Sequence, residues 1–215
     1  MMIKVKIYRV EKDISRKEIM LKINDNLYHE DKGYGFHIVN DGEVLEVKFT
    51  IRSISKQNIE YANGEHSEVE LATYLNVNFG IRQNKKIVLY AINPPVSMKV
   101  PYTMVHKLFG EESGLKPVEF DLRNVINGLS EQYDLKIKSM SLSNIPVDPF
   151  TLAKTKIVSS KNLYENYKGN YMKGSAILDS VHFFVNGIET EISRTGRFRV
   201  RESQLSTFLS ILESL

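Results

Sequence analysis

Alternation of apolar and polar residues is the strongest pattern in this chain, and it predicts mostly β-strands. In residues 45–52, Leu45, Val47, Phe49 and Ile51 alternate with charged or polar residues. Successive side chains of a strand point to opposite faces, so this segment should bury one face in a core. Weaker alternation and apolar content predict further strands over residues 1–10, 34–39, 68–79 and 86–92. The first 93 residues are therefore expected to form an antiparallel β-meander.

A group of prolines ends this β-rich region. Pro94, Pro95 and Pro101 follow the last predicted strand. Proline lacks the N–H that a sheet needs and restricts the residue before it, so the sheet should stop here. We place a boundary at residues 94–101 and expect residues 102–215 to form a second region with both helices and strands.

A short polar helix or loop is expected over residues 15–26, and the other helices are expected in this second region. Leu122, Val125, Ile126 and Leu129 recur at three- and four-residue steps, which predicts a helix over residues 120–133. Shorter helices are expected over residues 102–109, from Ser159 or Ser160 to Tyr167, and from about Ser203 to the end, with a strand over residues 135–142. The predicted fold class is α+β with antiparallel strands.

The last 35 residues predict a three-stranded antiparallel meander that leads into a closing helix. Its strands are expected at residues 181–185, 188–192 and 197–201, with Asn186-Gly187 as the first tight turn. In the third strand, Arg197, Arg199 and Arg201 should share one face while Phe198 and Val200 take the other.

Charge is distributed unevenly along the chain, whose net charge is +3. Residues 1–133 hold 18 basic and 18 acidic side chains, whereas residues 134–215 hold 11 and 8. The whole excess lies in the last part, next to the predicted arginine strand. An anionic partner is the simplest functional interpretation of such asymmetry.

The arginine strand therefore gives the first functional hypothesis, which is non-catalytic binding of DNA or RNA. Alternate residues of a strand stand roughly 7 Å apart, close to two ~3.4 Å steps along one nucleic-acid strand. Nearby cations and tyrosines could add contacts, and the predicted binding residues are Arg194, Arg197, Arg199, Arg201, Lys168, Lys173 and Tyr171. The alternative is that Glu189 and Glu191, on the neighbouring strand, pair with the arginines.

A second hypothesis is that the protein is an interaction subunit of a larger complex. Residues 93–98 and 145–150 each place hydrophobic side chains beside prolines. Loops of this kind can present a stiff apolar contact to a protein partner, although many only connect elements.

A third hypothesis is a Mg²⁺-dependent nuclease. Glu46-Val47-Lys48 has the E-x-K form in which a carboxylate binds the metal ion and a lysine steadies the attacking water or the phosphate. Asp41 or Asp31 could supply a second carboxylate. Alternating Glu and Lys also occur on any half-exposed strand, which is the competing interpretation.

Several chemistries are excluded or disfavoured by composition. The chain has no cysteine, which excludes disulfides, thiolate nucleophiles and cysteine-ligated metals. It has no P-loop, no dinucleotide fingerprint and no G-x-S-x-G, and its five histidines are dispersed, so we expect no cofactor. No apolar stretch could span a bilayer and no secretory signal is visible, so we expect a cytoplasmic protein without membrane contact.

Overall fold

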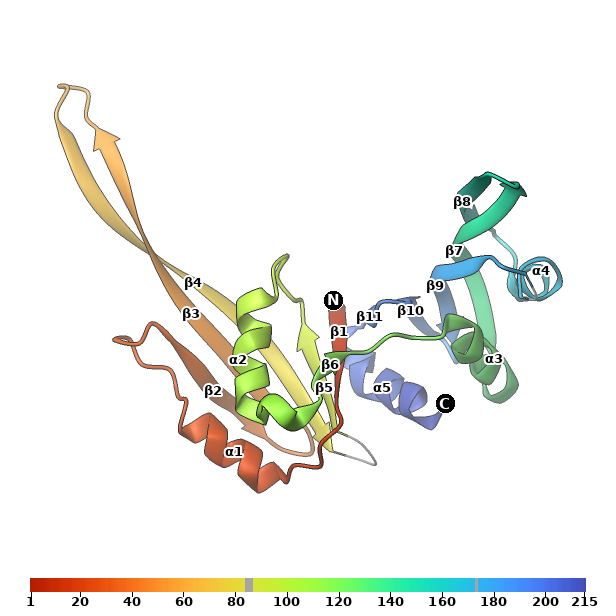
Figure 1. Ribbon diagram of the computed structural model, residues 1–215, viewed down its shortest axis with the longest axis horizontal. Coiled ribbons are helices and arrows are strands. Elements are labelled where there is room, and N and C mark those ends of the chain that lie inside the picture. Colours follow the sequence, from red (N-terminus) through yellow and green to blue (C-terminus); the bar gives the residue numbers. More distant parts are fainter. Residues whose placement is uncertain (84–86, 173) are drawn as a thin grey trace. The chain divides into compact units, whose positions relative to one another are not determined.

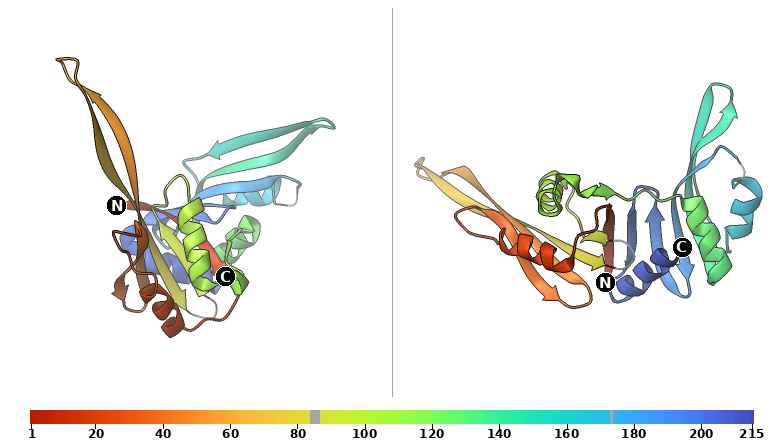
Figure 2. Two further views of the ribbon diagram at one scale, coloured as in Figure 1. Left: turned by 60° about the vertical axis from the view of Figure 1, so that its left-hand side comes forward. Right: turned by 60° about the horizontal axis from the view of Figure 1, so that its bottom comes forward.

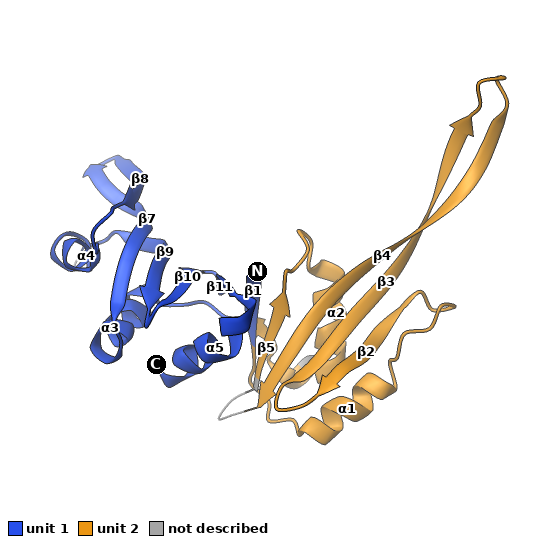
Figure 3. Cartoon of the chain, turned by 180° about the vertical axis from the view of Figure 1, so that it is seen from behind, with its two compact units in different colours: residues 1–8, 117–215 blue, residues 9–116 orange. Residues whose placement is uncertain are grey.

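The computed structural model describes residues 1–83, 87–172 and 174–215, and it confirms the α+β class with antiparallel strands (Figure 1). The chain divides into two compact units (Figure 3). Unit 1 comprises residues 1–8 and 117–215, and unit 2 comprises residues 9–116. Residues 94–101 join a strand to a helix inside unit 2. The division into domains at that point stays a prediction.

Unit 2 contains an antiparallel sheet covered by two helices. The strands follow the order β2-β3-β4-β5. The elements of this unit are α1 (Arg16–Asn24), β2 (Tyr34–Asp41), β3 (Leu45–Glu60), β4 (His66–Gln83), β5 (Ile87–Ile92), α2 (Lys99–Phe109) and the short 3-10 helix η1 (Glu111–Ser113). In the core of this unit, the rings of Phe36 and Phe49 pack with their centroids 5.1 Å apart. Helix α1 contributes the buried side chains of Ile19 and Ile23. The expected alternation in β3 is confirmed, because Leu45, Val47 and Phe49 are buried.

The β3–β4 hairpin is much longer than the sheet to which it belongs. The two strands pair continuously from Leu45 opposite Ile81 to Glu60 opposite His66. Pairing of β2 with β3 ends at Ile51, and pairing of β5 with β4 ends at Asn78. We call residues 53–73 the arm; it is two-stranded, almost entirely exposed, and extends beyond β2 and β5 in Figure 1. The sequence pattern gave no sign that this part of the hairpin would lack a sheet around it.

Unit 1 contains antiparallel strands in the order β1-β11-β10-β9-β7-β8. Two helices, α3 and α5, lie on one side of these strands (Figure 2). The elements are β1 (Met2–Val10), whose residues 2–8 belong to this unit, α3 (Leu122–Gln132), β7 (Leu135–Asp148), β8 (Thr151–Val158), α4 (Tyr164–Asn170), β9 (Ile177–Val185), β10 (Ile188–Ser193), β11 (Arg197–Arg201), η2 (Glu202–Gln204) and α5 (Leu205–Ser214). The two-residue strand β6 (Lys116–Pro117) stands where the chain passes between units.

The predicted C-terminal meander and closing helix are confirmed. Asn186 and Gly187 form the β9–β10 turn with φ of 47° and 79°, the positive values that a tight hairpin turn requires. Phe198 of β11 packs on Phe208 of α5, with ring centroids 5.1 Å apart. Asp121 begins α3 as its N-cap, where its side chain accepts hydrogen bonds from the Arg123 and Asn124 amides.

Two local expectations were wrong. Pro146 and Pro149 were expected in a loop, but Pro146 lies in β7 opposite Leu152 of β8, a strand that the sequence analysis did not predict. A bulge lies beside Pro146, and the pairing of β7 with β9 ends at Ser143, so Pro146 has a neighbouring strand on one side only, which is where sheets tolerate proline. Neither Ser159 nor Ser160 caps α4; instead Asn162 accepts a hydrogen bond from the Tyr164 amide.

Candidate nucleic-acid interface

The sheet of unit 1 has one buried face and one face of exposed or half-buried side chains. In β11, Phe198 and Val200 are buried, whereas Arg197, Arg199 and Arg201 are exposed. The strand register extends this second face across six strands. We call it the open face, and its residues are Met2, Lys4, Lys6, Lys136, Ser139, Ser141, Lys156, Val158, Ser180, His182, Phe184, Glu189, Glu191, Ser193, Arg197, Arg199 and Arg201.

Cations from the two ends of the chain meet on this face. The first strand of the chain pairs with β11, so Lys4 lies opposite Arg199 and Lys6 opposite Arg197. Like charges directly opposite each other on neighbouring strands are destabilising. The arginines were predicted from the sequence as binding residues, and the two lysines were not. Their alternation with Ile3 and Val5 was visible in the sequence, but their pairing with the far end of the chain was not.

Lys6 shows the electrostatic consequence of this arrangement. Partial burial lowers the pKa of its ammonium group, the Arg197 charge lowers the pKa further, and Glu119 acts in the opposite direction. The ammonium donates a hydrogen bond to the Thr195 carbonyl. The surroundings of Lys6 therefore disfavour the charged form of its ammonium group, on balance.

The two carboxylates of β10 differ in their partners. Glu191 lies opposite Arg199, with 3.6 Å between its Oε2 and the arginine Nη1. Glu189 instead contacts His182 on β9, with 3.2 Å between Oε1 and Nε2. The expected cross-strand pairing is therefore present for Glu191, and the contact of Glu189 is with a histidine. Five cations of β1 and β11 share this part of the face with two carboxylates.

Arg194 lies outside the open face, in the turn between β10 and β11. Its Nε is 3.4 Å from Oδ1 of Asp179, a carboxylate that also lies 3.9 Å from Nζ of Lys154. Asp179 is mostly buried, with 19% of its side chain exposed. This predicted binding residue therefore already has an anionic partner inside the protein.

Lys168 and Tyr171 lie at helix α4, away from the arginine strand. The Ser130 hydroxyl donates to the Tyr164 hydroxyl at 2.8 Å, which places α4 beside α3. Backbone contact of Leu163 with Ile137 fixes α4 next to β7, three strands from β11 in the sheet order. The structure does not bring these two residues together with the arginines. Lys173, also predicted to bind, lies outside the described residues.

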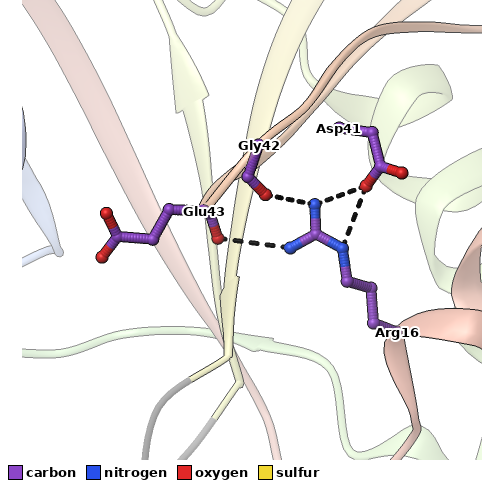
Figure 4. Close-up of polar contacts among 4 residues, drawn as sticks. All are labelled: Arg16, Asp41, Gly42 and Glu43. Carbon is purple, nitrogen blue, oxygen red and sulfur yellow. Dashed lines mark hydrogen bonds and ion pairs between the residues drawn. The ribbon is translucent and has the colours of Figure 1, made fainter.

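The E-x-K segment lies in unit 2, where its nearest predicted carboxylate partner is already bound. Arg16 donates from Nε to Oδ1 of Asp41 at 3.0 Å, and from Nη2 to the same oxygen at 2.5 Å. Arg16 also donates to the carbonyl oxygens of Gly42 and Glu43 (Figure 4). Asp41 thus anchors α1 to the β2–β3 turn. Across the described part of the chain, no three His, Asp or Glu residues are grouped so that they could hold a metal ion.

Comparison with protein-family models finds no match, and comparison with curated proteins finds no similar sequence. Within residues 1–83, 87–172 and 174–215, no helix is long and apolar enough to cross a membrane. The open face is therefore interpreted from its own chemistry.

Proposed function

We propose that this protein binds nucleic acid through the open face of unit 1, without catalysing a reaction on it. The observation that carries the proposal is the register that sets Lys6 opposite Arg197, whose charge adds to the lowering of the Lys6 pKa by burial. If this face served only as a solvated surface, opposite charges at these positions would make the sheet more stable than like charges do. A phosphate backbone would neutralise the cations and remove their mutual repulsion.

The spacing of the cations supports a backbone ligand. Two residues along a strand are about 7 Å apart, and neighbouring strands are about 4.8 Å apart. The cations of β1 and β11 therefore form a cluster two strands wide that would attract a phosphate backbone to this end of the open face. The chain has no cysteine and needs no oxidising compartment, so the proposed location is the cytoplasm.

The test is a binding titration with labelled DNA and RNA at about 50 mM and about 200 mM salt. Wild-type protein should bind at the lower salt and weaken steeply at the higher one. Replacing Arg197, Arg199 and Arg201 by Gln should lower the affinity and reduce the slope of log K against log salt by about 0.7–0.9 per lost phosphate contact. A double variant, Lys4→Gln with Lys6→Gln, should act in the same direction.

Lys17→Gln provides the matched control. Lys17 is exposed on α1 in unit 2, so its replacement removes a positive charge that does not belong to the open face. It should leave the affinity and the slope unchanged. Failure of the wild-type protein to bind any nucleic acid at about 50 mM salt, or wild-type affinity in the triple arginine variant, would refute the proposal.

A second candidate function, subunit of a protein complex, is favoured by the arm. All its charged side chains lie on one face or in the turn, at Lys56, Glu60, Glu65, His66, Glu68 and Glu70. The other face carries Ile59, Val69 and Leu71 among uncharged polar residues. An isolated two-stranded ribbon is marginally stable in water, so a partner that covers the uncharged face would stabilise it. Light scattering and co-purification, compared between wild-type protein and Leu71→Lys, test this candidate.

A further inference from the structure

A row of hydroxyl groups crosses the open face from one basic edge to the other. The register aligns Arg197 with Ser193 on β10, Ser193 with Ser180 on β9, and Ser180 with Ser141 on β7. Lys6 lies opposite Arg197 at one end, and Lys156 of β8 lies opposite Ser141 at the other. We call these six residues the serine row. It holds three serines between cations and contains no carboxylate.

The serine row has the length and chemistry of a phosphate track. Five strand spacings of about 4.8 Å give a path of about 24 Å, long enough for several nucleotides of a single strand. Hydroxyl groups of serine are common donors to phosphate oxygens, and cations at both ends attract the backbone. The three serines are half-buried. The Ser193 hydroxyl already donates to the Arg197 carbonyl oxygen at 3.3 Å and contacts the Thr195 hydroxyl at 3.0 Å, so it would donate to a phosphate oxygen only after giving up the first bond.

Rings lie on the next two rows, on one side of this track. His182 follows Ser180 by two residues on β9, and Phe184 follows by four, so both belong to the open face. Their ring centroids are 6.0 Å apart. Phe184 is half-buried rather than fully buried, although it lies on the polar face of the sheet. A partly exposed aromatic ring beside a phosphate track is suited to stacking on a base.

The carboxylates of the open face lie on the ring side of the track. Glu191 and Glu189 are two and four residues before Ser193 on β10. Carboxylates repel phosphates, but they accept hydrogen bonds from the amino groups of bases. The serine row thus contains no carboxylate of its own, while Asp179, which precedes Ser180, is paired with Arg194 and Lys154.

We propose that the open face binds single-stranded nucleic acid, with the backbone along the serine row and the bases over His182 and Phe184. This inference rests on the proposed function and adds the class of ligand to it. A duplex keeps its bases stacked on one another, so only its phosphates could reach the cations. A single strand can use both the track and the rings.

The test compares oligonucleotides of about 12 thymidines or uridines with a duplex of the same length. Wild-type protein should bind the single strands more tightly. Phe184→Leu should weaken single-strand binding about tenfold while leaving the salt slope unchanged, because a stacking contact releases no counterion. Lys156→Gln should reduce the slope by about 0.7, because it removes a phosphate contact.

Two further variants separate stacking from a loss of fold. Phe184→Tyr keeps the ring and should restore binding to near the wild-type level. Phe150→Leu is the matched control, since Phe150 is 98% exposed at the β7–β8 turn and lies outside the open face. It should bind like the wild-type protein.

The outcomes distinguish this inference from the proposed function. If single strands and duplex bind equally, and Phe184→Leu binds like the wild-type protein, the single-strand inference is wrong while nucleic-acid binding stands. If no nucleic acid binds at about 50 mM salt, both are wrong. Unchanged salt slope in Lys156→Gln would remove the serine row as the path of the backbone.

Discussion

Lys6 on β1 lies directly opposite Arg197 on β11, so two cations from opposite ends of the chain share one cross-strand position. The Arg197 charge contributes to the lowered pKa of Lys6, after the larger effect of burial. In the free protein this arrangement opposes folding, and a bound anion would reverse the effect. The relationship thus connects the stability of unit 1 to the proposed ligand.

The first prediction follows from that repulsion. Arg197→Gln should stabilise the free protein by a few tenths of a kcal/mol, since like-charged cross-strand pairs cost about 0.2–1 kcal/mol. Arg199→Gln should bring no such gain, because Arg199 also contacts Glu191. Urea unfolding at low salt measures both. Destabilisation by Arg197→Gln of more than about 0.5 kcal/mol would show that the arginine has a structural partner.

The second prediction concerns the core of unit 2. Phe49 is fully buried against Phe36, whereas Lys48 points to the other face of β3 and is half-buried. Phe49→Ala should destabilise by roughly 3–5 kcal/mol, as expected for truncation of a buried aromatic ring. Lys48→Ala should cost well under ~1 kcal/mol. Chemical denaturation measures the difference, and equal losses would contradict the register of β3.

Local alternation and turn chemistry were sufficient to predict β3 and the C-terminal meander. In β3, a shift of the strand register by one residue would move Phe49 from the core to the exposed face, so the alternation determines the register. Asn186-Gly187 accepts the positive φ values that the tight turn between β9 and β10 requires. The partnership of β1 with β11 was not predictable, because no local pattern encodes a pairing between residues such as Lys6 and Arg197 at opposite ends of the chain. Only part of the open face could therefore be predicted from the sequence. The arginines were predicted, but the lysines and the serine row were not.

The third prediction is a pH dependence at the base of the arm. Glu30 accepts hydrogen bonds from Tyr28, Tyr74 and Arg52, and these contacts lower the pKa of its carboxyl group. A carboxyl whose pKa falls on folding stabilises the protein above its unfolded pKa, and that contribution is lost as pH falls through the folded value.

Glu30→Gln should therefore lower the unfolding midpoint at about pH 7, and the difference from the wild-type protein should shrink as the pH falls below 4.5, the ordinary pKa of a glutamate. The same contact raises the pKa of Tyr28 to about 12, so Tyr28 should titrate late in an ultraviolet pH titration of the wild-type protein and earlier in Glu30→Gln. A midpoint difference that persists unchanged in acid would show that the glutamate acts by packing and not by charge.

The fourth prediction concerns catalysis. Purified protein should leave linear and circular DNA and RNA uncut in Mg²⁺ or Mn²⁺, since Asp41 is bound by Arg16 and is not available beside Glu46. Cleavage that is lost in Glu46→Ala would instead support the nuclease hypothesis, because removal of a metal ligand removes the Lewis acid. Gel analysis over several hours is sufficient to distinguish these outcomes.

The last prediction concerns the arm. Residues 53–73 are almost entirely exposed and pair only with each other, so they contribute little to the core of unit 2. Replacing residues 55–71 with Asn-Gly, which joins Ile54 to Ala72 through a short turn, should retain the fold with a loss below about 1 kcal/mol. The arm has more acidic than basic residues, so its removal should not weaken nucleic-acid binding.

Should the shortened protein bind nucleic acid normally but lose an associated protein or its own oligomeric state, the two functions would reside in different units: nucleic-acid binding on the open face of unit 1 and protein interaction on the arm of unit 2. A large loss of stability in a monomeric wild-type protein would contradict the view that the arm is independent of the core.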